Sequence, residues 1–254
     1  MQKNRPVKTT RTSLELLEVI KELDGATVGE LVDETGLARS TLHNHLQTLL
    51  EAGYLVKEFN TYHLGLKLFQ LGEYARTRKR EYELAEEAVE RLAVRTDMEA
   101  DFNIEEYGRL INLHDMIANS SESGLDIGNY FYMHNTAAGK AMLAAYPRDR
   151  QEEIIETRGL PRETEHTITD EEELLAELEF VQEQGYAVND EECILGYKTF
   201  GKAIHYPDGR VFGGMAVGGP TYLMDTDREA SIRSKLFVAT DELEEEVAAL
   251  FNDQ

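Results

Sequence analysis

The chain has 254 residues, enough for a small domain and a medium-sized domain that each have a core. Its single cysteine excludes an intramolecular disulfide and a cysteine-rich metal cage, and no apolar run reaches the roughly 18 residues of a membrane-spanning helix. The formal net charge is −23, but residues 1–80 carry 12 Lys and Arg and 10 Asp and Glu, a net charge of +2, whereas residues 81–254 carry 14 and 39, a net charge of −25.

The first eleven residues form a basic segment without an acidic side chain, and its cations are Lys3, Arg5, Lys8 and Arg11. No apolar segment follows it, so it does not have the form of a secretory signal, and we expect a cytoplasmic protein. A basic segment at one end of an otherwise acidic chain is typical of a protein that contacts nucleic acid.

Three helices are predicted before Gly53. Residues 12–23 repeat apolar side chains at helical spacing behind Thr12, which is suited to cap the helix. The side chains expected to face inward are Leu14, Leu17 and Ile20. A second helix is predicted over residues 28–35, ended by Gly36, and a third over residues 38–52.

Residues 54–65 contain two short stretches of strand-forming residues around Asn60-Thr61, which we expect to be the turn of a hairpin. The order helix, helix, turn, helix, hairpin is typical of a winged helix-turn-helix. Residues 66–96 again show helical spacing. We therefore predict a DNA-binding domain over residues 1–65, a linker helix over 66–80 and a second domain over 81–254.

The third helix has an apolar face and a polar face. At 100° per residue its leucines fall within an arc of about 100°, which would pack on the other two helices. The opposite face and the helix N-terminus supply the candidate DNA contacts, which are Arg39, Ser40, Thr41, His43, Asn44, Gln47 and Thr48. Asn44 and Gln47 can each pair with adenine through two hydrogen bonds, and Arg39 is placed to contact phosphate.

A polar helix face is more often simply solvated, but this one follows the turn at Gly36 and precedes a hairpin, which favours DNA. The hairpin adds Lys57 and Tyr62 as candidate contacts to the DNA backbone. His43 and His45 lie about 200° apart on a helix, so they cannot chelate one metal ion. We expect no metal and no cofactor.

In the second domain, strands and helices alternate in groups, which indicates an α+β sheet domain. The expected strands are 100–105, 109–117, 186–190, 197–205 and 210–217. The expected helices begin near Thr136 and cover 149–157, 170–184 and 225–251, and a loop rich in Ser, Gly and Asn is expected over 119–129.

Residues 35–72 resemble the DNA-binding domain of the IclR family, which carries a Thr-Gly-Leu-x-Arg-Ser-Thr-x-His run. The segment His134-Asn135-Thr136-Ala137-Ala138-Gly139-Lys140-Ala141 is similar to the family's His-x-x-x-x-Gly-Lys-Ala element. Further family landmarks follow in order: Gly159-Leu160-Pro161, Thr167-Ile168, residues 185–192 and Gly218-Gly219-Pro220. The resemblance covers nearly the whole chain.

The resemblance implies a transcriptional regulator with a GAF-like effector-binding domain, which binds a palindromic operator in double-stranded DNA as a homodimer, often paired into a tetramer. It also implies control of a catabolic pathway, as repressor or activator, by a small anionic metabolite such as an organic acid or sugar acid. Carried over by position, the effector contacts are Ala137, Ala138, Gly139, Asn189, Thr199, Ala216 and Gly218. The family commonly has Asp, Cys, Ser and Ser at the last four places, so this pocket has fewer hydroxyl groups.

If Gly218 forms part of the pocket floor, Gly218→Leu should block the ligand and leave stability nearly intact. Two other classes of function stay open. An enzyme built on the second domain is disfavoured because no nucleophile or catalytic carboxylate pair stands out, and a sensor module whose winged helix binds proteins is disfavoured by the uncharged reading face. The excess of acidic over basic residues further suggests a halophilic protein.

Overall fold

The computed structural model describes residues 6–117 and 127–252, and divides the chain into two compact units, Met1–Arg78 and Lys79–Gln254. Lys3 and Arg5 of the predicted basic segment, and most of the loop expected over 119–129, lie outside the described residues. No described helix combines the length and apolar character needed to cross a membrane.

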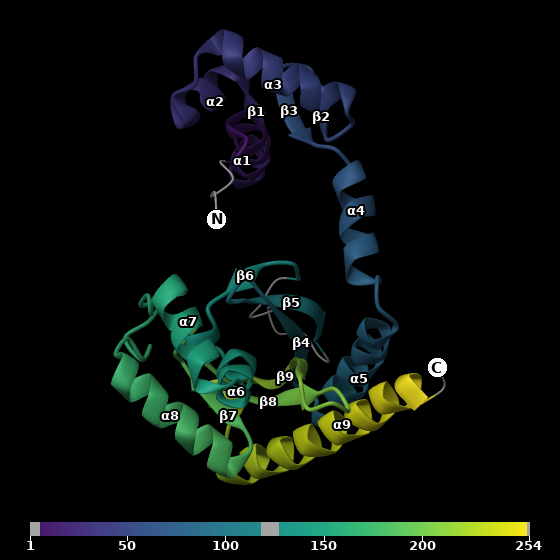
Figure 1. Ribbon diagram of the computed structural model, residues 1–254, viewed down its shortest axis with the longest axis vertical. Helices are drawn as coiled ribbons and strands as arrows, with labels where there is room; N and C mark the ends of the chain where they lie inside the picture. The colour runs from purple at the N-terminus through teal and green to yellow at the C-terminus, as the bar shows by residue number, and fades with distance from the viewer. Residues whose placement is uncertain (1–5, 118–126, 253–254) are drawn as a thin grey trace. The chain divides into compact units, whose positions relative to one another are not determined.

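The first unit has a small three-stranded antiparallel sheet and three packed helices, followed by a separate helix (Figure 1). Its elements are α1 (Lys8–Glu22), β1 (Ala26–Thr27), α2 (Val28–Thr35), α3 (Arg39–Glu51), β2 (Leu55–Glu58), β3 (Thr61–Leu64) and α4 (Lys67–Arg76). The order β1-β3-β2 places the hairpin beside a short strand that the sequence pattern did not predict. This is the predicted winged helix-turn-helix.

The turn between α2 and α3 forms for local reasons. Thr27 caps α2 reciprocally with Glu30, since the Thr27 side chain accepts from the Glu30 N–H and the Glu30 side chain accepts from the Thr27 N–H. Gly36 ends the helix at φ +64°, a left-handed conformation that glycine adopts without a steric penalty. These two signals fix the angle at which the chain enters α3.

Helix α1 differs from its prediction. It begins at Lys8, with Val7 as N-cap, so Thr12 lies inside the helix and caps nothing. Leu16 and Ile20 face the core, whereas Leu14 is largely exposed. The predicted start was wrong because Lys8 to Arg11 have no apolar side chain to show the helical spacing, although nothing in them prevents a helix.

In the second unit, helices cover both faces of a six-stranded antiparallel sheet with the order β6-β5-β4-β9-β8-β7 (Figure 1). The strands are β4 (Glu99–Glu106), β5 (Arg109–Met116), β6 (Tyr130–Phe131), β7 (Ala187–Asp190), β8 (Tyr197–His205) and β9 (Val211–Pro220). The helices are α5 (Arg80–Thr96), α6 (Ala137–Ala145), α7 (Arg148–Arg158), α8 (Glu171–Gln184) and α9 (Thr226–Asn252). The predicted α+β class is confirmed, and β6 is a further unpredicted strand.

The two faces of the sheet are covered differently. Helices α5 and α9 pack on one face, and α6 packs on the other with α8 outside it. Strand β4 alternates between the faces: Ala100 and Phe102 belong to the core under α5 and α9. Because side chains of a strand point alternately to opposite sides, Glu99, Asp101 and Asn103 face α6. That polar face of β4 positions the cavity described below.

The segment joining the units is shorter as a helix than predicted. Helix α4 ends at Arg76, residues 77–79 are not helical, and α5 begins at Arg80. The predicted helix over residues 66–80 is therefore interrupted before its end. Apolar spacing continues from one helix into the next, so the interruption does not show in the pattern.

Candidate functional site

The polar face of α3 is exposed along its length. The helix begins at Arg39, three residues after the turn at Gly36, and buries Leu42, Leu46 and Leu49 against α1 and α2. The predicted reading residues Arg39, Ser40, Thr41, His43, Asn44, Gln47 and Thr48 are all exposed. The structure therefore brings them together on one accessible face.

Hydrogen bonds already occupy some of these side chains. The Thr48 hydroxyl donates to the Asn44 carbonyl at 2.8 Å, and Gln47 Nε2 donates to Glu51 Oε1 at 2.8 Å. To pair with adenine, the Gln47 amide would first have to leave Glu51. Asn44 needs no such rearrangement, because its carbonyl and not its side-chain amide takes part in the bond from Thr48.

The two histidines of α3 have different environments. His43 is exposed, whereas His45 is partly buried and its Nδ1 lies 2.7 Å from the Ser13 hydroxyl of α1. His45 therefore ties α3 to α1.

In the hairpin, the structure contradicts one predicted DNA contact, Tyr62. Tyr62 is only 4% exposed, because it points from β3 into the core of the first unit. Lys57 remains accessible on β2, with Nζ 5.0 Å from the centre of the Tyr62 ring.

The turn of the hairpin lies at Phe59-Asn60 and not at Asn60-Thr61, and Phe59, at the tip of the turn, is 99% exposed. The prediction missed Phe59 because an apolar residue in a short strand-forming stretch is usually buried.

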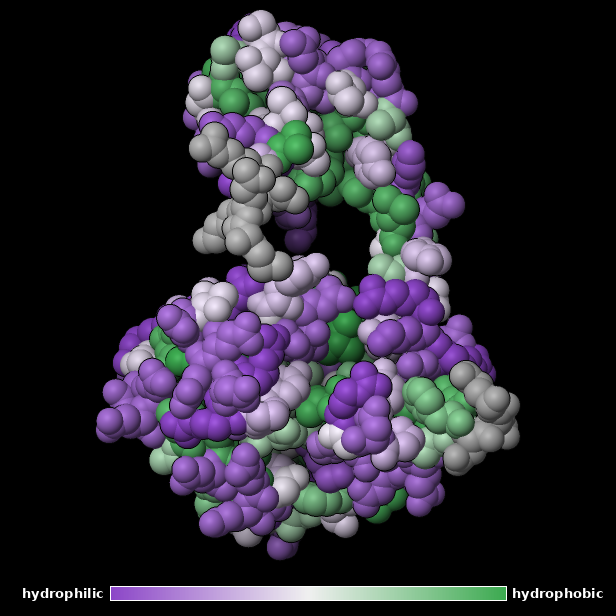
Figure 2. Space-filling view, viewed as in Figure 1, coloured by the Kyte–Doolittle hydropathy of each residue, from purple (hydrophilic) through white to green (hydrophobic). Residues whose placement is uncertain are grey.

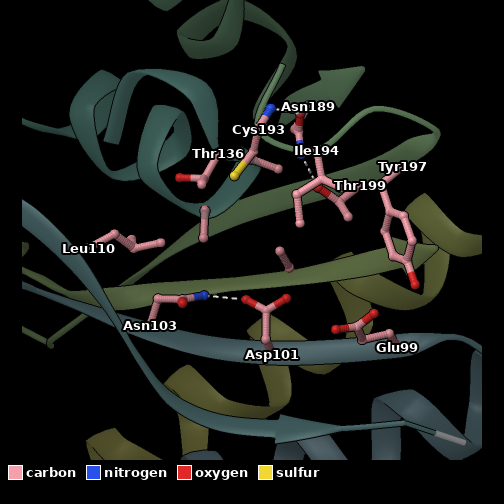
Figure 3. Close-up of a pocket in the computed structure, with 13 residues that line it drawn as sticks. Glu99, Asp101, Asn103, Leu110, Thr136, Asn189, Cys193, Ile194, Tyr197 and Thr199 are labelled. Carbon is pink, nitrogen blue, oxygen red and sulfur yellow. Dashed lines mark hydrogen bonds between the residues drawn. The ribbon is translucent and has the colours of Figure 1, made fainter. Parts of the chain in front are cut away.

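A small cavity of about 30 Å³ lies between the sheet of the second unit and α6. Its lining comes from β4, β5, β7, β8, β9, the start of α6 and the loop after β7 (Figure 3). The lining residues are Glu99, Asp101, Asn103, Leu110, Thr136, Ala137, Ala138, Asn189, Cys193, Ile194, Tyr197, Thr199 and Ala216. Five of the seven effector residues predicted from the resemblance are among them.

Gly139 and Gly218 do not line the cavity. A Cβ on Gly139 would meet the Met133 carbonyl and the Thr136 hydroxyl, and one on Gly218 would meet the Lys198 carbonyl and Thr199. Both glycines therefore serve close packing of backbone on backbone. The expectation that Gly218→Leu would fill the pocket without affecting stability is wrong, since even a methyl group has no room at this position.

Asn189 supports the cavity wall with all of its polar atoms. Its Oδ1 accepts from the N–H groups of Glu192 and Cys193, at 2.9 and 3.2 Å, and its Nδ2 donates to Thr199 Oγ1 at 3.3 Å. The hydroxyl of Thr164 reaches the same loop by donating to the Glu191 carbonyl at 2.7 Å. Asn189 therefore shapes the loop over the cavity, and the Thr199 hydroxyl keeps its own proton to donate.

The opposite wall carries acidic side chains that sequence reasoning did not identify. Figure 3 shows Asn103, Asp101 and Glu99 along one strand with their side chains toward the cavity. Asn103 Nδ2 donates to Asp101 Oδ1. Burial, aided by the nearby Glu99 and Asp115, raises the pKa of Asp101 to about 7, against the opposing effect of the Asn103 hydrogen bond. Near neutral pH this carboxyl is therefore poised to exchange its proton.

Lys140 of α6 is 1% exposed and does not face the cavity lining. Its Nζ donates to Glu192 Oε1 at 2.6 Å and to Glu177 Oε1 at 2.9 Å. Burial raises the pKa of Glu192 although Lys140 acts in the opposite direction. The Lys of the Gly-Lys-Ala element thus joins α6 to α8 and to the loop after β7.

The described lining has the features of a binding site, and its one cysteine is not an activated nucleophile. Burial raises the pKa of the Cys193 thiol to about 12, so the thiol stays protonated at neutral pH. Within the described part of the chain, no group of three or more His, Cys, Asp and Glu side chains has the arrangement to hold a metal ion.

Comparison with family models supports both halves of this description. Residues 12–58 match the IclR helix-turn-helix domain, and residues 80–244 match the model described as bacterial transcriptional regulator IclR C-terminal.

Individual proteins agree. The chain is 32% identical over 221 residues to a probable HTH-type transcriptional regulator ArcR of Halobacterium salinarum, covering 85% of this chain and 84% of that one. A crystal structure of the Thermotoga maritima IclR superposes with a TM-score of 0.79 at 21% identity, covering 95% and 99% of the two chains. An IclR homologue from Microbacterium hydrocarbonoxydans, complexed with 4-hydroxybenzoate, gives a TM-score of 0.72 at 19% identity, covering 86% and 91%. These relatives are regulators and not enzymes.

Proposed function

The chain belongs to the IclR family of transcriptional regulators, and from this premise we propose that it binds a palindromic operator through α3 and the hairpin, under the control of a small organic acid bound in the cavity of its second unit. The observation that carries the proposal is the exposed polar face of α3, held behind the turn at Gly36. A helix presented in this way is suited to the major groove of DNA.

Within that face the side chains have different roles. Asn44 reads a base, because its exposed amide offers a donor and an acceptor in the geometry that matches adenine. Arg39 contacts phosphate from the N-terminal end of α3, where backbone N–H groups also favour an anion. Lys57 and Phe59 reach the DNA from the hairpin, and Lys8 and Arg11 add positive charge at the start of α1.

The protein acts as a homodimer. Helix α4 and the residue before it expose large apolar side chains, with Leu66 at 85% and Phe69 at 71%, joined by Leu71 and Tyr74. Figure 2 shows apolar atoms along this segment. A second copy of the chain would cover them, and a symmetric dimer would place two copies of α3 in major grooves about 34 Å apart or at a multiple of that spacing. Dimers pair further into tetramers.

The effector is a small organic acid. Ala137 and Ala138 line the cavity at the N-terminus of α6, where the first N–H groups have no partner within the helix. Thr136 caps the next two positions, since its Oγ1 accepts from Gly139 and its carbonyl from Lys140. A carboxylate is therefore favoured at the Ala137 end. The 4-hydroxybenzoate held by the Microbacterium homologue is an acid of this general kind.

The acidic surface suits a concentrated salt solution. Figure 2 shows mostly hydrophilic atoms on the visible face of the second unit, and the charge of residues 81–254 is −25. In molar salt the Debye length falls to about 3 Å, so these carboxylates no longer repel DNA at a distance. We propose that the protein works at high salt.

An electrophoretic mobility shift with the DNA upstream of its own gene, run in molar KCl, tests the proposal. The wild-type protein should retard this DNA and footprint a palindrome, Arg39→Ala should lose most of the binding, and Glu22→Gln on α1 should bind as the wild type does. If folded wild-type protein leaves the DNA unshifted and instead captures a protein through the winged helix, the DNA-binding function is wrong.

A further inference from the structure

The cavity wall formed by β4 is built of hydrogen-bond acceptors. Glu99, Asp101 and Asn103 occupy alternate positions of the strand and are 7%, 4% and 0% exposed. The Asn103 amide gives its N–H group to Asp101, while its Oδ1 is buried without a hydrogen-bond partner. A buried amide oxygen that accepts no hydrogen bond destabilises the folded protein, so this wall favours a ligand that brings N–H or O–H groups.

The described lining of the cavity is acidic, since it carries the two carboxyl groups of Glu99 and Asp101. Among the described residues that line it there is no Lys, Arg or His. The nearest buried cation on α6, Lys140, is committed to Glu177 and Glu192. Burial of a carboxylate is costly, and the raised pKa of Asp101 reflects that cost.

The other walls have a different chemistry. Opposite the acidic strand, the cavity meets the N-terminus of α6 at Ala137 and Ala138, which favours a negative group. Between the two ends, Leu110 and Ile194 supply apolar surface. One cavity thus presents acceptors at one wall, donors at another and a carbon-lined surface between them (Figure 3).

We propose that the effector is an amino acid or another amino-carboxylate: its ammonium group binds Glu99, Asp101 and Asn103 Oδ1, its carboxylate binds the N-terminus of α6, and its carbon chain lies against Leu110 and Ile194. This inference rests on the proposed regulatory role of the cavity and names the class of ligand.

An ammonium group fits the acidic wall better than hydroxyl groups do. It has three N–H donors and no acceptor, which matches two carboxyl groups and one amide oxygen, and it brings a positive charge to an acidic wall. A sugar acid could donate through its hydroxyls, but its carboxylate would bring a net negative charge to a site whose described lining is acidic and holds no Lys, Arg or His.

Binding to the full-length protein can be measured by thermal shift and titration calorimetry, with DNA omitted and KCl held constant. The probes are matched pairs that differ only in the amino group: glycine and acetate, β-alanine and propionate, γ-aminobutyrate and butyrate. L-alanine with lactate and pyruvate, and gluconate, complete the set. At least one amino-carboxylate should bind about tenfold or more tightly than its partner without nitrogen, the scale of a charge-assisted hydrogen bond.

Two variants locate the effect. Asp101→Asn and Glu99→Gln each remove a charge and keep the shape, and each should lower affinity for the preferred amino-carboxylate about tenfold while changing affinity for the acid without nitrogen little. Glu179→Gln, which removes an exposed carboxylate of α8, should change neither affinity. Glu99→Gln keeps the test valid if Asp101→Asn fails to fold.

The inference is overturned if the acids without nitrogen or gluconate bind as well as the amino-carboxylates, if none of the probes binds, or if both variants retain the preference. Retardation of operator DNA is assayed separately. A protein that binds DNA but shows no preference for amino-carboxylates disproves this inference and leaves the proposed function standing, whereas a failure to bind DNA disproves the proposed function.

Discussion

The two units place their working groups in opposite ways. The first unit has nearly balanced charge and presents polar side chains such as Asn44 on an exposed helix, above a core of leucines. The second unit is strongly acidic on its surface, yet its candidate ligand-binding groups, such as Asp101 and Asn103, lie almost fully buried on the inner face of a sheet. An exposed group on a helix costs little stability, whereas a buried polar group must be compensated by its surroundings.

This difference predicts that substitutions in the buried interior of the second unit, at the cavity or packed beside it, change stability, and that substitutions on the exposed face of α3 change binding alone.

Gly218→Ala should destabilise the second unit by roughly 3 kcal/mol or more, because the added methyl group collides with the Lys198 carbonyl and Thr199, which belong to a paired strand and cannot move aside. Gly219→Ala is the matched control on the same strand. Its methyl group would lie 2.8 Å from Met98 Cε, the end of a flexible side chain, so its cost should be much smaller. Hydrogen exchange of the β8 and β9 amides measures the loss of stability in both variants. Equal losses for Gly218→Ala and Gly219→Ala would mean that the packing at Gly218 is loose.

Asp101→Asn should stabilise the ligand-free protein in a pH-dependent way. The pKa of Asp101 is raised from 3.8 to about 7, so the folded state holds more protons than the unfolded chain between these values, and wild-type stability falls as the pH rises through that window. The advantage of the variant should therefore grow by roughly 1.4 kcal/mol per pH unit up to about pH 7 and then level off.

Denaturant unfolding at a series of pH values, in constant salt, checks this expectation. Glu179→Gln controls for the change in net charge, because it removes a carboxylate from the surface of α8. A variant advantage that stays constant from pH 5 to pH 8 would mean that Asp101 is ionised throughout, and the two units would then differ less than proposed.

The exposed site of the first unit could be predicted from the sequence, whereas the buried site of the second unit could not. The face of α3 was predictable because helical spacing separates leucines from polar residues, and a leucine face leaves only one side for contact with DNA. The alternation from Glu99 to Ile104 indicated a strand with one polar face, but an alternating strand is most often solvated on that face. That α6 covers this face is a property of the tertiary fold and of register, such as the pairing of Asp101 with Ala216.

Two predictions about single residues were wrong because they also depended on tertiary structure. Tyr62 was assigned to DNA contact because it belongs to the hairpin, but its position in β3 points inward, as a shift of one residue along a strand reverses the face. Gly218 was assigned to the pocket by its place in the family pattern, and only the neighbouring strand shows that the glycine makes room for backbone.

Asn44→Ala should relax the sequence preference at one base pair by about 1–3 kcal/mol without changing stability, because the Asn44 side chain is exposed in the free protein. Selection of binding sites from a random pool measures the change. Gln47→Ala is the comparison, and its effect should be smaller because the Gln47 amide must first leave Glu51. If Asn44→Ala leaves the selected motif unchanged and Gln47→Ala changes it, the residues that read the bases lie nearly one helical turn further along α3 than proposed.

Phe59→Ala should have the smallest effect, a uniform loss of about 1 kcal/mol in DNA affinity across all sequences. A side chain that is 99% exposed contributes almost nothing to the core, so the substitution should leave unfolding unchanged. Any contribution of the Phe59 side chain must therefore come from contact with a partner such as DNA. An apolar side chain at the tip of a hairpin can lie against sugars or between bases in the minor groove. Such a contact buries apolar surface without forming hydrogen bonds to particular bases, which is why the loss should not depend on sequence.

Lys57→Ala, on the adjacent strand, is the comparison. It should also weaken binding to every DNA sequence, but it should reduce the salt dependence of binding as well, since it removes a cation near phosphate. If Phe59→Ala alters the salt dependence and Lys57→Ala does not, the hairpin meets the DNA in a different orientation. If neither matters, α3 alone carries the contact, and the exposed working groups of the first unit are confined to one helix.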